Sequence, residues 1–464
     1  MSFHSVVRAQ QSSPLAYPLR WSADKAERIV EAMNAGLPYV PGEVLVKFKT
    51  GMGPSEQSRA LQSLRSRPLS NALRWHGDYA ELRDQTESDA TILAAQLRSQ
   101  PEVEYATPNY IRHRHATPND PSFSLQWNFK LIDMPGAWDI NPGGSGAIVA
   151  SVDTGVTTTT QDFTFKTWSG TALQNFTARF AVSPDIESSR LLSGADFVFW
   201  GGPVLDMDGH GTHTASTMAE TTNNGLAEAG LAFKAKILPV KACFGFWDLQ
   251  FIMSANNIPG FPNSDGGCQD SDIADGIRFA ADNGANAINL SLGGPDPAPE
   301  ILDALRYAVS KGAFVAVAAG NEFDQGNPVE FPAAYGPQID GVMTVGAVGP
   351  QLEHAFYSNT GTYVEIAAPG GDSHAGGSST AAIWQTTILE TDSDIETVFF
   401  PRFDRYGETP LQGTSMATPH VTATAALLFS QGVKNPAAIE ALIKATAKDI
   451  GAPGRDNEFG FGLI

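Results

Sequence analysis

The chain contains 464 residues, and its 50 acidic side chains exceed its 30 Lys and Arg, so its formal net charge at pH 7 is −20. A surface of this charge argues against nucleic acid and an anionic membrane as partners, and no apolar stretch reaches transmembrane length. The length suits one large domain together with a smaller one, and we expect a monomer.

Residues 1–36 form a polar N-terminal extension to which we assign no function. Its one regular feature is a short helical pattern over residues 24–33. The extension lacks the continuous apolar core of a signal peptide, so an export signal is not visible in this chain.

Residues 37–117 have the pattern of a small α+β domain. Its predicted elements are a strand at 42–49, a helix at 55–67, a strand at 75–82, a helix at 90–99 and a strand at 103–111. The first strand alternates apolar and polar residues, as a half-buried strand does. The order of elements favours a ferredoxin-like fold, and the polar, Pro-rich segment 112–121 indicates an exposed, cleavable linker.

Residues 118–464 alternate buried strands with helices. The strands are predicted at 147–152, 285–290, 313–318 and 341–345, and the helices at 271–283, 300–311 and 435–448. This alternation predicts an α/β fold with a doubly wound, mostly parallel sheet between two helix layers. Residues 371–411 are acidic and irregular, and we expect an inserted surface loop there.

The chain has two cysteines, Cys243 and Cys268, on either side of a loop rich in Gly, Asn and Pro. We expect them to pair, and such a bridge would contribute on the order of 3 kcal/mol by restricting the unfolded chain. Two reduced thiols are the alternative, because two cysteines do not make a disulfide framework.

A serine stands at the start of a long apolar run near the C-terminus. Residues 413–420 are Gly-Thr-Ser-Met-Ala-Thr-Pro-His, and the Ala- and Leu-rich run that follows predicts a buried helix ending near Gly432. Pro419 is expected in the first turn, where a missing N–H does no harm. Ser415 would then lie at a helix N-terminus, where free N–H groups favour the negative charge that builds during attack on a carbonyl. Alone, such a serine is more often a helix cap.

Two further segments place acid–base groups at the ends of predicted elements. Asp153 ends a strand, and the carboxyl ends of strands are where open α/β sheets hold their sites. His210 and His213 open a helix of small residues. An Asp can orient a His that acts as a base, whereas the His-Gly-Thr-His spacing could instead supply two metal ligands.

Four segments together resemble the motifs of the subtilisin-like serine proteases, or subtilases. They are Val-Asp-Thr-Gly-Val at 152–156, Asp-Gly-His-Gly-Thr-His at 208–213, Ala-Ala-Gly-Asn at 318–321, and residues 413–420. The resemblance implies that Ser415 is the nucleophile, His210 the general base and Asp153 the group that stabilises the imidazolium. It also implies that Asn321 and the Ser415 N–H bind the oxyanion, and that His213 is structural.

Residues 37–117, with Val-Glu-Tyr-Ala-Thr-Pro-Asn-Tyr at 103–110, resemble the inhibitory pro-domain of the same family. The resemblance therefore implies a secreted serine endopeptidase made as a self-inhibited zymogen, with its own pro-domain as inhibitor and polypeptides as substrates. Residues 118–464 would be the catalytic domain. One alternative is a narrow processing protease that prefers basic residues before the cut, and another is a scaffold that only binds. For 37–117 the alternative is an unrelated binding domain.

The same resemblance implies which residues bind substrate. Ser291, Leu292 and Gly293 match the edge that pairs with an extended peptide, and Gly320 lies beside the oxyanion donor. At the floor of the primary pocket the family often has Gly two residues before a Pro, whereas this chain has Glu330. A carboxylate there could pair with a substrate Lys or Arg, or it could turn to solvent or bind a second cation.

The resemblance also implies a structural Ca²⁺ ion. The family binds it with a Gln near the mature N-terminus, an Asp after the catalytic Asp and an Asn-containing loop after the catalytic His. The implied ligands, all of them oxygens, are Gln126, Asp162, Thr222, Asn224, Leu226 and Glu228. The loop is one residue longer than in the type member of the family, which leaves the ligand set open.

Overall fold

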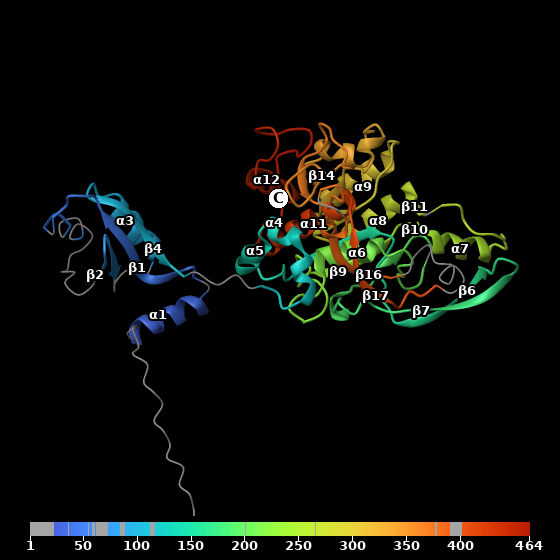
Figure 1. Cartoon of the computed structure of the whole chain (residues 1–464), viewed down its shortest axis with the longest axis horizontal. Coiled ribbons are helices and arrows are strands. Elements are labelled where there is room, and N and C mark those ends of the chain that lie inside the picture. Colours follow the sequence, from blue (N-terminus) through green and yellow to red (C-terminus); the bar gives the residue numbers. More distant parts are fainter. Residues whose placement is uncertain are drawn as a thin grey trace, which may run out of the picture. The chain divides into compact units, whose positions relative to one another are not determined.

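The computed structural model describes residues 23–35, 37–53, 55–57, 61, 73–83, 89–111, 117–199, 201–264, 266–375, 378–389 and 401–464. The chain forms two compact units, Met1–Arg114 and His115–Ile464, each with its own sheet and apolar core (Figure 1). None of the helices in the described ranges combines the length and the apolar character that a membrane crossing requires.

The first unit contains a four-stranded antiparallel sheet in the order β2-β3-β1-β4. Its elements are α1 (Ala23–Asn34), β1 (Tyr39–Phe48), β2 (Leu73–His76), β3 (Tyr79–Arg83), α3 (Ala90–Arg98) and β4 (Val103–Tyr110). Val44, Leu82 and Leu93 meet in its core. This is the sheet order of the predicted ferredoxin-like fold. Residues 55–57 and 61 are helical, and the other residues of the helix predicted at 55–67 lie outside the described ranges.

The prediction of one strand at 75–82 is wrong, because the chain reverses direction within it. β2 and β3 pair as a hairpin in which His76 lies opposite Tyr79. The two residues between them begin with Gly77, whose φ of +73° is left-handed and costs glycine no strain. The predicted order of elements contained three strands, and the division of 75–82 into β2 and β3 gives the four strands of the observed sheet.

Helix α1 follows the helical pattern predicted at 24–33 and is tied to β1. Lys25 and Arg28 form ion pairs with Glu43 at 3.3 and 2.8 Å. Glu43 is fully buried, so these two cations compensate a charge that would otherwise be costly to remove from water.

The second unit is built around a seven-stranded sheet in the order β15-β14-β13-β12-β5-β9-β8. Every neighbouring pair is parallel. The strands are β5 (Ile148–Asp153), β8 (Ala195–Asp196), β9 (Lys236–Lys241), β12 (Ala287–Leu290), β13 (Phe314–Ala318), β14 (Val342–Val348) and β15 (Ile366–Pro369). The central strands are buried on both faces, which explains their continuous apolar runs.

Helices cover both faces of this sheet. The helices of this unit are α4 (Trp127–Leu131), α5 (Met134–Ile140), α6 (His210–Ala219), α7 (Phe246–Ala255), α8 (Asp270–Asp282), α9 (Pro299–Ser310), α11 (Thr414–Ser430) and α12 (Pro436–Thr446). α8 and α9 pack on one face, where Val152, Ile277 and Leu305 share a core. α6, α11 and α12 pack on the other face, around residues such as Val149 and Phe314. The predicted doubly wound sheet is confirmed.

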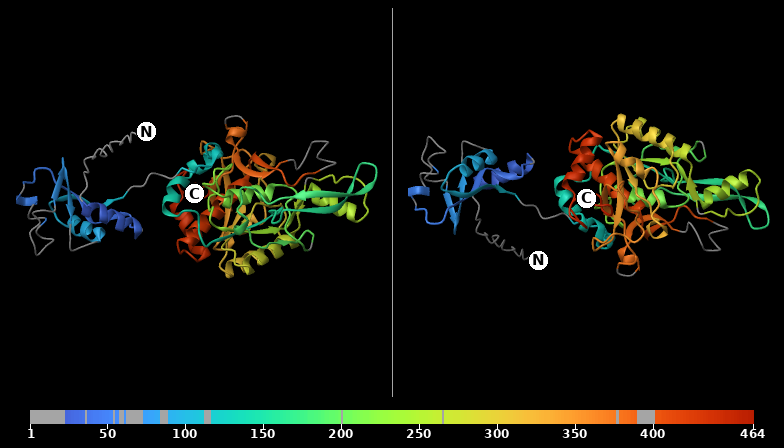
Figure 2. Two further views of the ribbon diagram at one scale, coloured as in Figure 1. Left: turned by 90° about the horizontal axis from the view of Figure 1, so that it is seen from below. Right: turned by 90° about the horizontal axis from the view of Figure 1, so that it is seen from above.

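Two antiparallel hairpins lie outside the central sheet. They are β6 (Gln161–Trp168) with β7 (Leu173–Phe180), and β16 (Ile383–Ile388) with β17 (Tyr406–Leu411). The first hairpin projects at one end of the unit beside α7, as Figures 1 and 2 show.

The prediction that 371–411 is a surface loop is wrong, because β16 packs against α6. Ser216 Oγ donates to the carbonyl of Thr386 at 3.0 Å, and the hydroxyl of Thr387 donates to the carbonyl of Gly209. The strand carries buried Gln and Thr side chains, and its sequence therefore lacks the usual apolar pattern. The hydroxyls of Thr386 and Thr387 both donate hydrogen bonds to other segments. Residues 390–400 of this segment lie outside the described ranges.

A short strand pair next to the central sheet contains both cysteines. β10 (Cys243–Gly245) and β11 (Gly266–Cys268) pair antiparallel, and Cys243 and Cys268 form a disulfide, as predicted. The bridge closes a loop that contains α7, whose residues Trp247 and Phe251 are buried in an aromatic cluster.

Candidate active site

The end of β5 and the start of α6 bring an aspartate and a histidine into contact. Asp153 is the last residue of β5 and His210 the first of α6, and His210 Nδ1 donates a 2.7 Å hydrogen bond to Asp153 Oδ1. Asp153 is 2% exposed and also accepts hydrogen bonds from the Thr154 N–H and from Thr214 Oγ1. Because the carboxylate can only accept, the imidazole is held with Nδ1 protonated and Nε2 available as a base.

Ser415 is the second residue of α11, so its N–H has no acceptor within the helix. Its Oγ donates to the carbonyl of Ser291 at 3.4 Å. The helix begins at Thr414, five residues before Pro419, so the prediction that Pro419 lies in the first turn is wrong. Pro419 has no N–H to give to the Ser415 carbonyl, and the hydroxyl of Ser291 donates to that carbonyl instead, at 2.7 Å.

Asn321 lies just after β13 and faces the start of α11. Its Oδ1 accepts hydrogen bonds from the N–H and the hydroxyl of Thr414 at 2.8 and 2.9 Å, which fixes the orientation of the amide. Asn321 and Ser415 line the same cavity of about 120 Å³. Gly320 has φ +110°, and a Cβ there would lie 2.6 Å from Glu330 Cγ, so the chain needs glycine at this position.

Carboxylates set the charge of His210. Burial is the largest single influence and lowers its pKa, but the charge and hydrogen bond of Asp153, with the charges of Asp208 and Asp206, outweigh it and raise the pKa of His210 to about 9. With this pKa the imidazole is a strong proton acceptor, and its neutral, basic form predominates only at alkaline pH.

His213 has a separate set of partners. Its Nε2 donates to the carbonyls of Ile383 and Thr409 in the β16–β17 hairpin, and burial lowers its pKa to about 4. His213 is therefore neutral, and its hydrogen-bond partners are different from those of His210. The two-histidine metal interpretation of the His-Gly-Thr-His spacing finds no support in this geometry.

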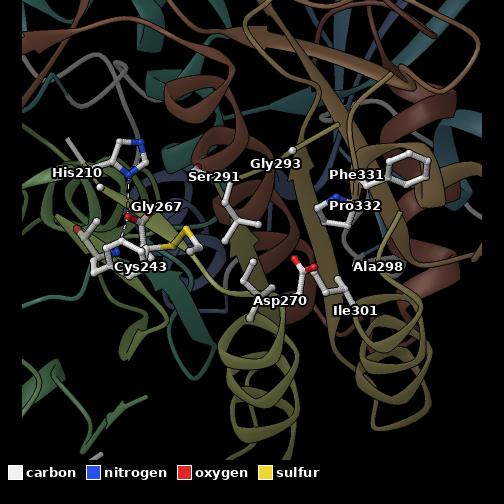
Figure 3. Close-up of a pocket in the computed structure, with 18 of the residues that line it drawn as sticks. His210, Cys243, Gly267, Asp270, Ser291, Gly293, Ala298, Ile301, Phe331 and Pro332 are labelled. Atoms are coloured by element: carbon white, nitrogen blue, oxygen red, sulfur yellow. Dashed lines mark hydrogen bonds and ion pairs between the residues drawn. A yellow bond between two sulfur atoms is a disulfide. The ribbon is translucent and has the colours of Figure 1, made fainter. Parts of the chain in front are cut away.

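The residues expected to bind substrate lie between two cavities. A cavity of about 520 Å³ is lined by His210 at one end and by Phe331 at the other, with Ser291 and Gly293 between them (Figure 3). Leu292 and Gly293 also line the 120 Å³ cavity of Ser415, so the two spaces share one wall. The disulfide forms part of the wall of the larger cavity.

Glu330 is 5% exposed and lines the small cavity with Ser415 and Asn321. Burial, followed by repulsion from Glu322, raises the pKa of its carboxyl to about 7. Within the described ranges no Lys or Arg forms an ion pair with it. A buried carboxylate without a counter-ion among the described residues therefore faces the cavity that Ser415 also lines.

Comparison with known proteins places this arrangement in a family. The sequence profile of the subtilase family matches residues 144–462. The chain belongs to the subtilase family. A profile described as the fervidolysin N-terminal prodomain matches residues 25–109, so the first unit is a prodomain. This subtilase is accordingly a serine protease that acts on peptide bonds.

Two relatives cover most of this subtilase. It is 32% identical to a thermophilic serine proteinase of Bacillus sp. (strain AK1), over 91% of this chain and 86% of the relative. It is 34% identical to thermitase of Thermoactinomyces vulgaris, over 73% of this chain and 94% of thermitase. The crystal structure of fervidolysin from Fervidobacterium pennivorans, a keratinolytic enzyme related to subtilisin, shares the fold with a TM-score of 0.53 at 24% identity. That match covers 92% of this chain and 60% of fervidolysin.

The expected calcium ligands of this subtilase do not all come together. The structure gives Asp162 no support as a ligand, because it lies on β6 with its side chain 54% exposed and pairs with Arg179 of β7 at 3.0 Å. Gln126 is buried, but both ends of its amide bind the backbone of Ala229, at 2.8 and 2.9 Å. Gln126 therefore anchors the loop 222–228, in which Thr222, Asn224, Leu226 and Glu228 lie.

Two other aspartates lie at this loop. Asp120 accepts hydrogen bonds from the N–H groups of Asn223 and Asn224 at 2.8 and 3.2 Å. Asp185 accepts one from the Asn224 amide, and its buried Oδ2 has no partner within the described ranges. An unpartnered buried carboxylate oxygen beside a second carboxylate fits a hard cation. No group of three His, Cys, Asp or Glu with metal-site spacing occurs among the described residues, so a cation would need amide and backbone oxygens as well.

Sequence reasoning missed Asp185 because the β6–β7 hairpin separates it from Asp153. The alternating Phe163, Phe165 and Phe176 are a strand signal that would have revealed the hairpin. It also missed Asp206, which is fully buried just before α6. Its signal is an acidic residue that precedes a predicted helix start, where carboxylates commonly bind free N–H groups.

Proposed function

We propose that this subtilase is an endopeptidase that cleaves peptide bonds through an acyl-enzyme. Ser415 Oγ attacks the carbonyl carbon of the scissile bond while His210 Nε2 takes its proton, and Asp153 stabilises the imidazolium. Asn321 Nδ2 and the Ser415 N–H donate to the oxyanion. His210 then returns the proton to the leaving amine, and water releases the acyl group by the same steps.

The observation that carries this proposal is the 2.7 Å contact between His210 and the buried Asp153, next to the wall shared with the cavity of Ser415 and Asn321. The contact would orient His210 as the base, and the proposed nucleophile Ser415 lines the same cavity as the proposed oxyanion donor Asn321, which supports the assignment. In the free protein Ser415 Oγ is engaged with Ser291, and catalytic hydrogen bonds commonly tighten only when substrate binds.

A fluorophosphonate probe tests the triad directly. We expect stoichiometric labelling at Ser415 that is abolished in Ser415→Ala and in His210→Ala, since both remove the activated nucleophile. Asn321→Ala is the matched variant for the oxyanion site, and it should retain a reactive serine while kcat falls on the order of 10²- to 10³-fold. Absence of labelling in the parent protein would reject the proposal.

We propose that the prodomain makes the protein a self-inhibited zymogen. The prodomain profile and the Pro-rich linker at 112–121 support cleavage within 112–119, leaving 118–464 as the catalytic domain. The profile begins at residue 25, so we count α1 with the prodomain and not with the extension expected at 1–36. Residues 112–116 lie outside the described ranges. Purified Ser415→Ala should accumulate at full length, and normal processing of that variant would show that another protease makes the cut.

We propose that a structural Ca²⁺ ion binds at Asp120, Asp185 and Asn224 together with backbone oxygens of the loop 222–228. The unpartnered Oδ2 of Asp185 supports this assignment. The ion would neutralise the paired carboxylates and hold the loop that follows α6. We also propose that the protein is secreted, because a structural disulfide persists in oxidising compartments, and that it acts as a monomer on polypeptides.

A second candidate function is processing with a preference for Lys or Arg before the cut. Glu330 favours it, because its carboxylate lacks a counter-ion in the cavity beside Ser415. A substrate cation would supply that counter-ion at the moment of binding.

A further inference from the structure

Asp206 is the most heavily hydrogen-bonded carboxylate near the triad, although the triad mechanism gives it no task. It is fully buried in the loop that leads into α6. Its Oδ1 accepts from Thr154 Oγ1 at 3.0 Å, and from the N–H groups of Asp208 and Gly209 at 3.0 and 2.9 Å. Its Oδ2 accepts from both the N–H and the hydroxyl of Thr212, at 3.0 and 2.5 Å.

Thr154 connects this carboxylate to both acid–base residues. Its Oγ1 donates to Asp206 and accepts from the Gly211 N–H at 2.9 Å. Thr154 directly follows Asp153, and Gly211 directly follows His210. Thr154 and Gly211, the residues that follow Asp153 and His210, are therefore joined by a hydrogen bond of their own, in addition to the bond between the two side chains.

Two carboxylates of the preceding loop bind the free N–H groups at the start of α6. Asp208 accepts from the His210 N–H at 3.1 Å, and Asp206 accepts from the Thr212 N–H at 3.0 Å. Gly209 precedes the helix with φ +103° and offers no side-chain acceptor. The free N–H groups of the first turn favour a negative charge, and Asp206 supplies it from the preceding loop. His210 is the first residue of this turn, so its position follows that of the turn.

We infer that Asp206 is a positioning residue for peptide hydrolysis, acting through Thr154 and the first turn of α6 to hold His210 against Asp153. The inference rests on the proposed triad, and it adds a residue that touches neither the substrate nor the reacting atoms. Hydrogen bonds to an ionised group are stronger and more directional than neutral ones, so this carboxylate limits the freedom of the turn.

The charge of Asp206 separates its role from that of Thr154. Around Asp206 lie Lys241 of β9, Asp248 of α7, Tyr406 of β17 and Asp208 of its own loop. His210 faces Asp153 from β5, Asp206 and Asp208 from the loop before α6, and His213 on its own helix. The negative charge of Asp206 favours the imidazolium, whereas the Thr154 hydroxyl is neutral.

The test compares Asp206→Asn, Thr154→Val and Thr154→Ser, with kcat and KM measured per active site after fluorophosphonate titration. We expect the first two to lower kcat on the order of 100-fold with KM little changed, because a misplaced base slows chemistry rather than binding. Thr154→Ser keeps the hydroxyl and should restore kcat. Asp206→Asn should also move the acid limb of the kcat/KM profile to lower pH, and Thr154→Val should leave that limb in place.

Thr424→Val is the matched control, since it removes a hydroxyl that donates to the His420 carbonyl at 2.8 Å further along α11. It should lower the thermal midpoint and keep kcat. Unchanged kcat in Asp206→Asn and Thr154→Val, or no recovery in Thr154→Ser, would overturn the inference. If Asp206→Asn fails to fold, the two Thr154 variants decide. If the parent enzyme is not labelled at Ser415, the proposed triad is wrong and this inference falls with it.

Discussion

The hydroxyl of Ser291 donates a 2.7 Å hydrogen bond to the carbonyl oxygen of Ser415. In an uninterrupted helix that carbonyl would accept from the N–H four residues later, but Pro419 stands there and has none. The strand edge expected to bind substrate thus completes the helix of the proposed nucleophile. This contact fixes the position of Ser415 relative to the peptide that would lie along Ser291.

Ser291→Ala should therefore impair catalysis as well as stability. The change removes the hydroxyl of Ser291, which is 6% exposed, and leaves the Ser415 carbonyl without its donor, which costs about 1–3 kcal/mol and frees the first turn of α11. We expect kcat to fall about tenfold, since each 1.36 kcal/mol is a factor of ten. Ser310→Ala removes an equally short serine-to-carbonyl bond at the exposed end of α9 and should leave kcat unchanged. Equal kcat in the two variants would contradict the prediction.

Glu330 should make specificity depend on pH. Its carboxyl, with a pKa raised to about 7, is neutral below that pH and charged above it. The ratio of kcat/KM for peptides with Arg before the cut to those with Phe should rise roughly tenfold to a hundredfold through this range. The titration of His210 affects both substrates and cancels in the ratio. In Glu330→Gln this ratio should stay low and should not change with pH. In the control Glu300→Gln, at an exposed site, it should change with pH as in the parent. A parent enzyme that prefers Phe at every pH would disprove the role.

Glu330 should also lower stability at alkaline pH. A folded-state pKa above the ordinary value of 4.5 means that the folded protein holds this proton more tightly than the unfolded chain does. The stabilising contribution of the protonated carboxyl is complete below about pH 4.5 and is lost as pH rises through about 7. Thermal scans should therefore show Glu330→Gln gaining stability relative to the parent at pH 8, with little gain at pH 4. A difference of the opposite sign would show that the charged form has a partner.

Calcium should stabilise the protein through Asp185 and not through Asp162. A ligand that binds only the folded state adds about 2.7 kcal/mol at a hundred times its Kd. We expect calcium to raise the thermal midpoint and a chelator to lower it, and Asp185→Asn or Asn224→Ala to reduce the difference. Asp162→Asn, on the exposed β6–β7 hairpin, is the control and should respond to calcium as the parent does. A midpoint that is insensitive to chelator would remove the calcium proposal.

The Cys243–Cys268 disulfide should contribute about 3.5 kcal/mol by restricting the 25-residue separation that it spans. Cys243→Ser with Cys268→Ser should lower the free energy of unfolding by that amount in denaturant titrations. Because both cysteines line the larger cavity, kcat/KM should fall more for long peptides than for short ones. Treating the parent with a reducing agent should lower its stability and its kcat/KM as the double substitution does. The same treatment should leave the double variant unchanged. Equal losses for long and short peptides would mean that the bridge only stabilises the fold.

Phe403, three residues before β17, should hold the start of that strand against β7. It is fully buried and stacks on Phe180 of β7 with ring centroids 4.8 Å apart. Phe403→Ala should cost about 3–5 kcal/mol, and Phe403→Leu less than about 1.5 kcal/mol because most of the volume remains. Ile140→Ala, at a side chain that is 78% exposed, is the control and should cost little. A loss from Phe403→Ala no larger than that of the control would show that the fold does not depend on this contact.

Much of this molecule follows from local sequence. The apolar runs and helical spacings located four of the seven sheet strands, β5, β12, β13 and β14, and helices α8, α9 and α12, to within a few residues, because side-chain periodicity is set by the backbone geometry of each element. The strands β8, β9 and β15 were not predicted. The motifs around Asp153, His210, Asn321 and Ser415 were equally local. Each combines a reactive side chain with the glycines or helix start that position it, so a short segment carries the whole signal.

What the sequence left open depends on contacts between distant segments. The strand at 383–388 escaped prediction because the partners of its buried polar groups lie far earlier in the chain. The Thr387 hydroxyl donates to the Gly209 carbonyl before α6, and the Thr386 carbonyl accepts from Ser216, 170 residues earlier. The sequence favours Asp162 over Asp185 as a calcium ligand because Asp162 is nearer to Asp153 in the chain. Spacing alone cannot show that Asp162 lies on the β6–β7 hairpin, whereas Asp185 contacts Asn224.

The pairing of Cys243 with Cys268, the unpaired carboxylate of Glu330 in its cavity and the five donors around Asp206 were likewise decided by tertiary structure. Burial can be inferred from periodicity, whereas the partner of a buried polar group is fixed only when the elements pack.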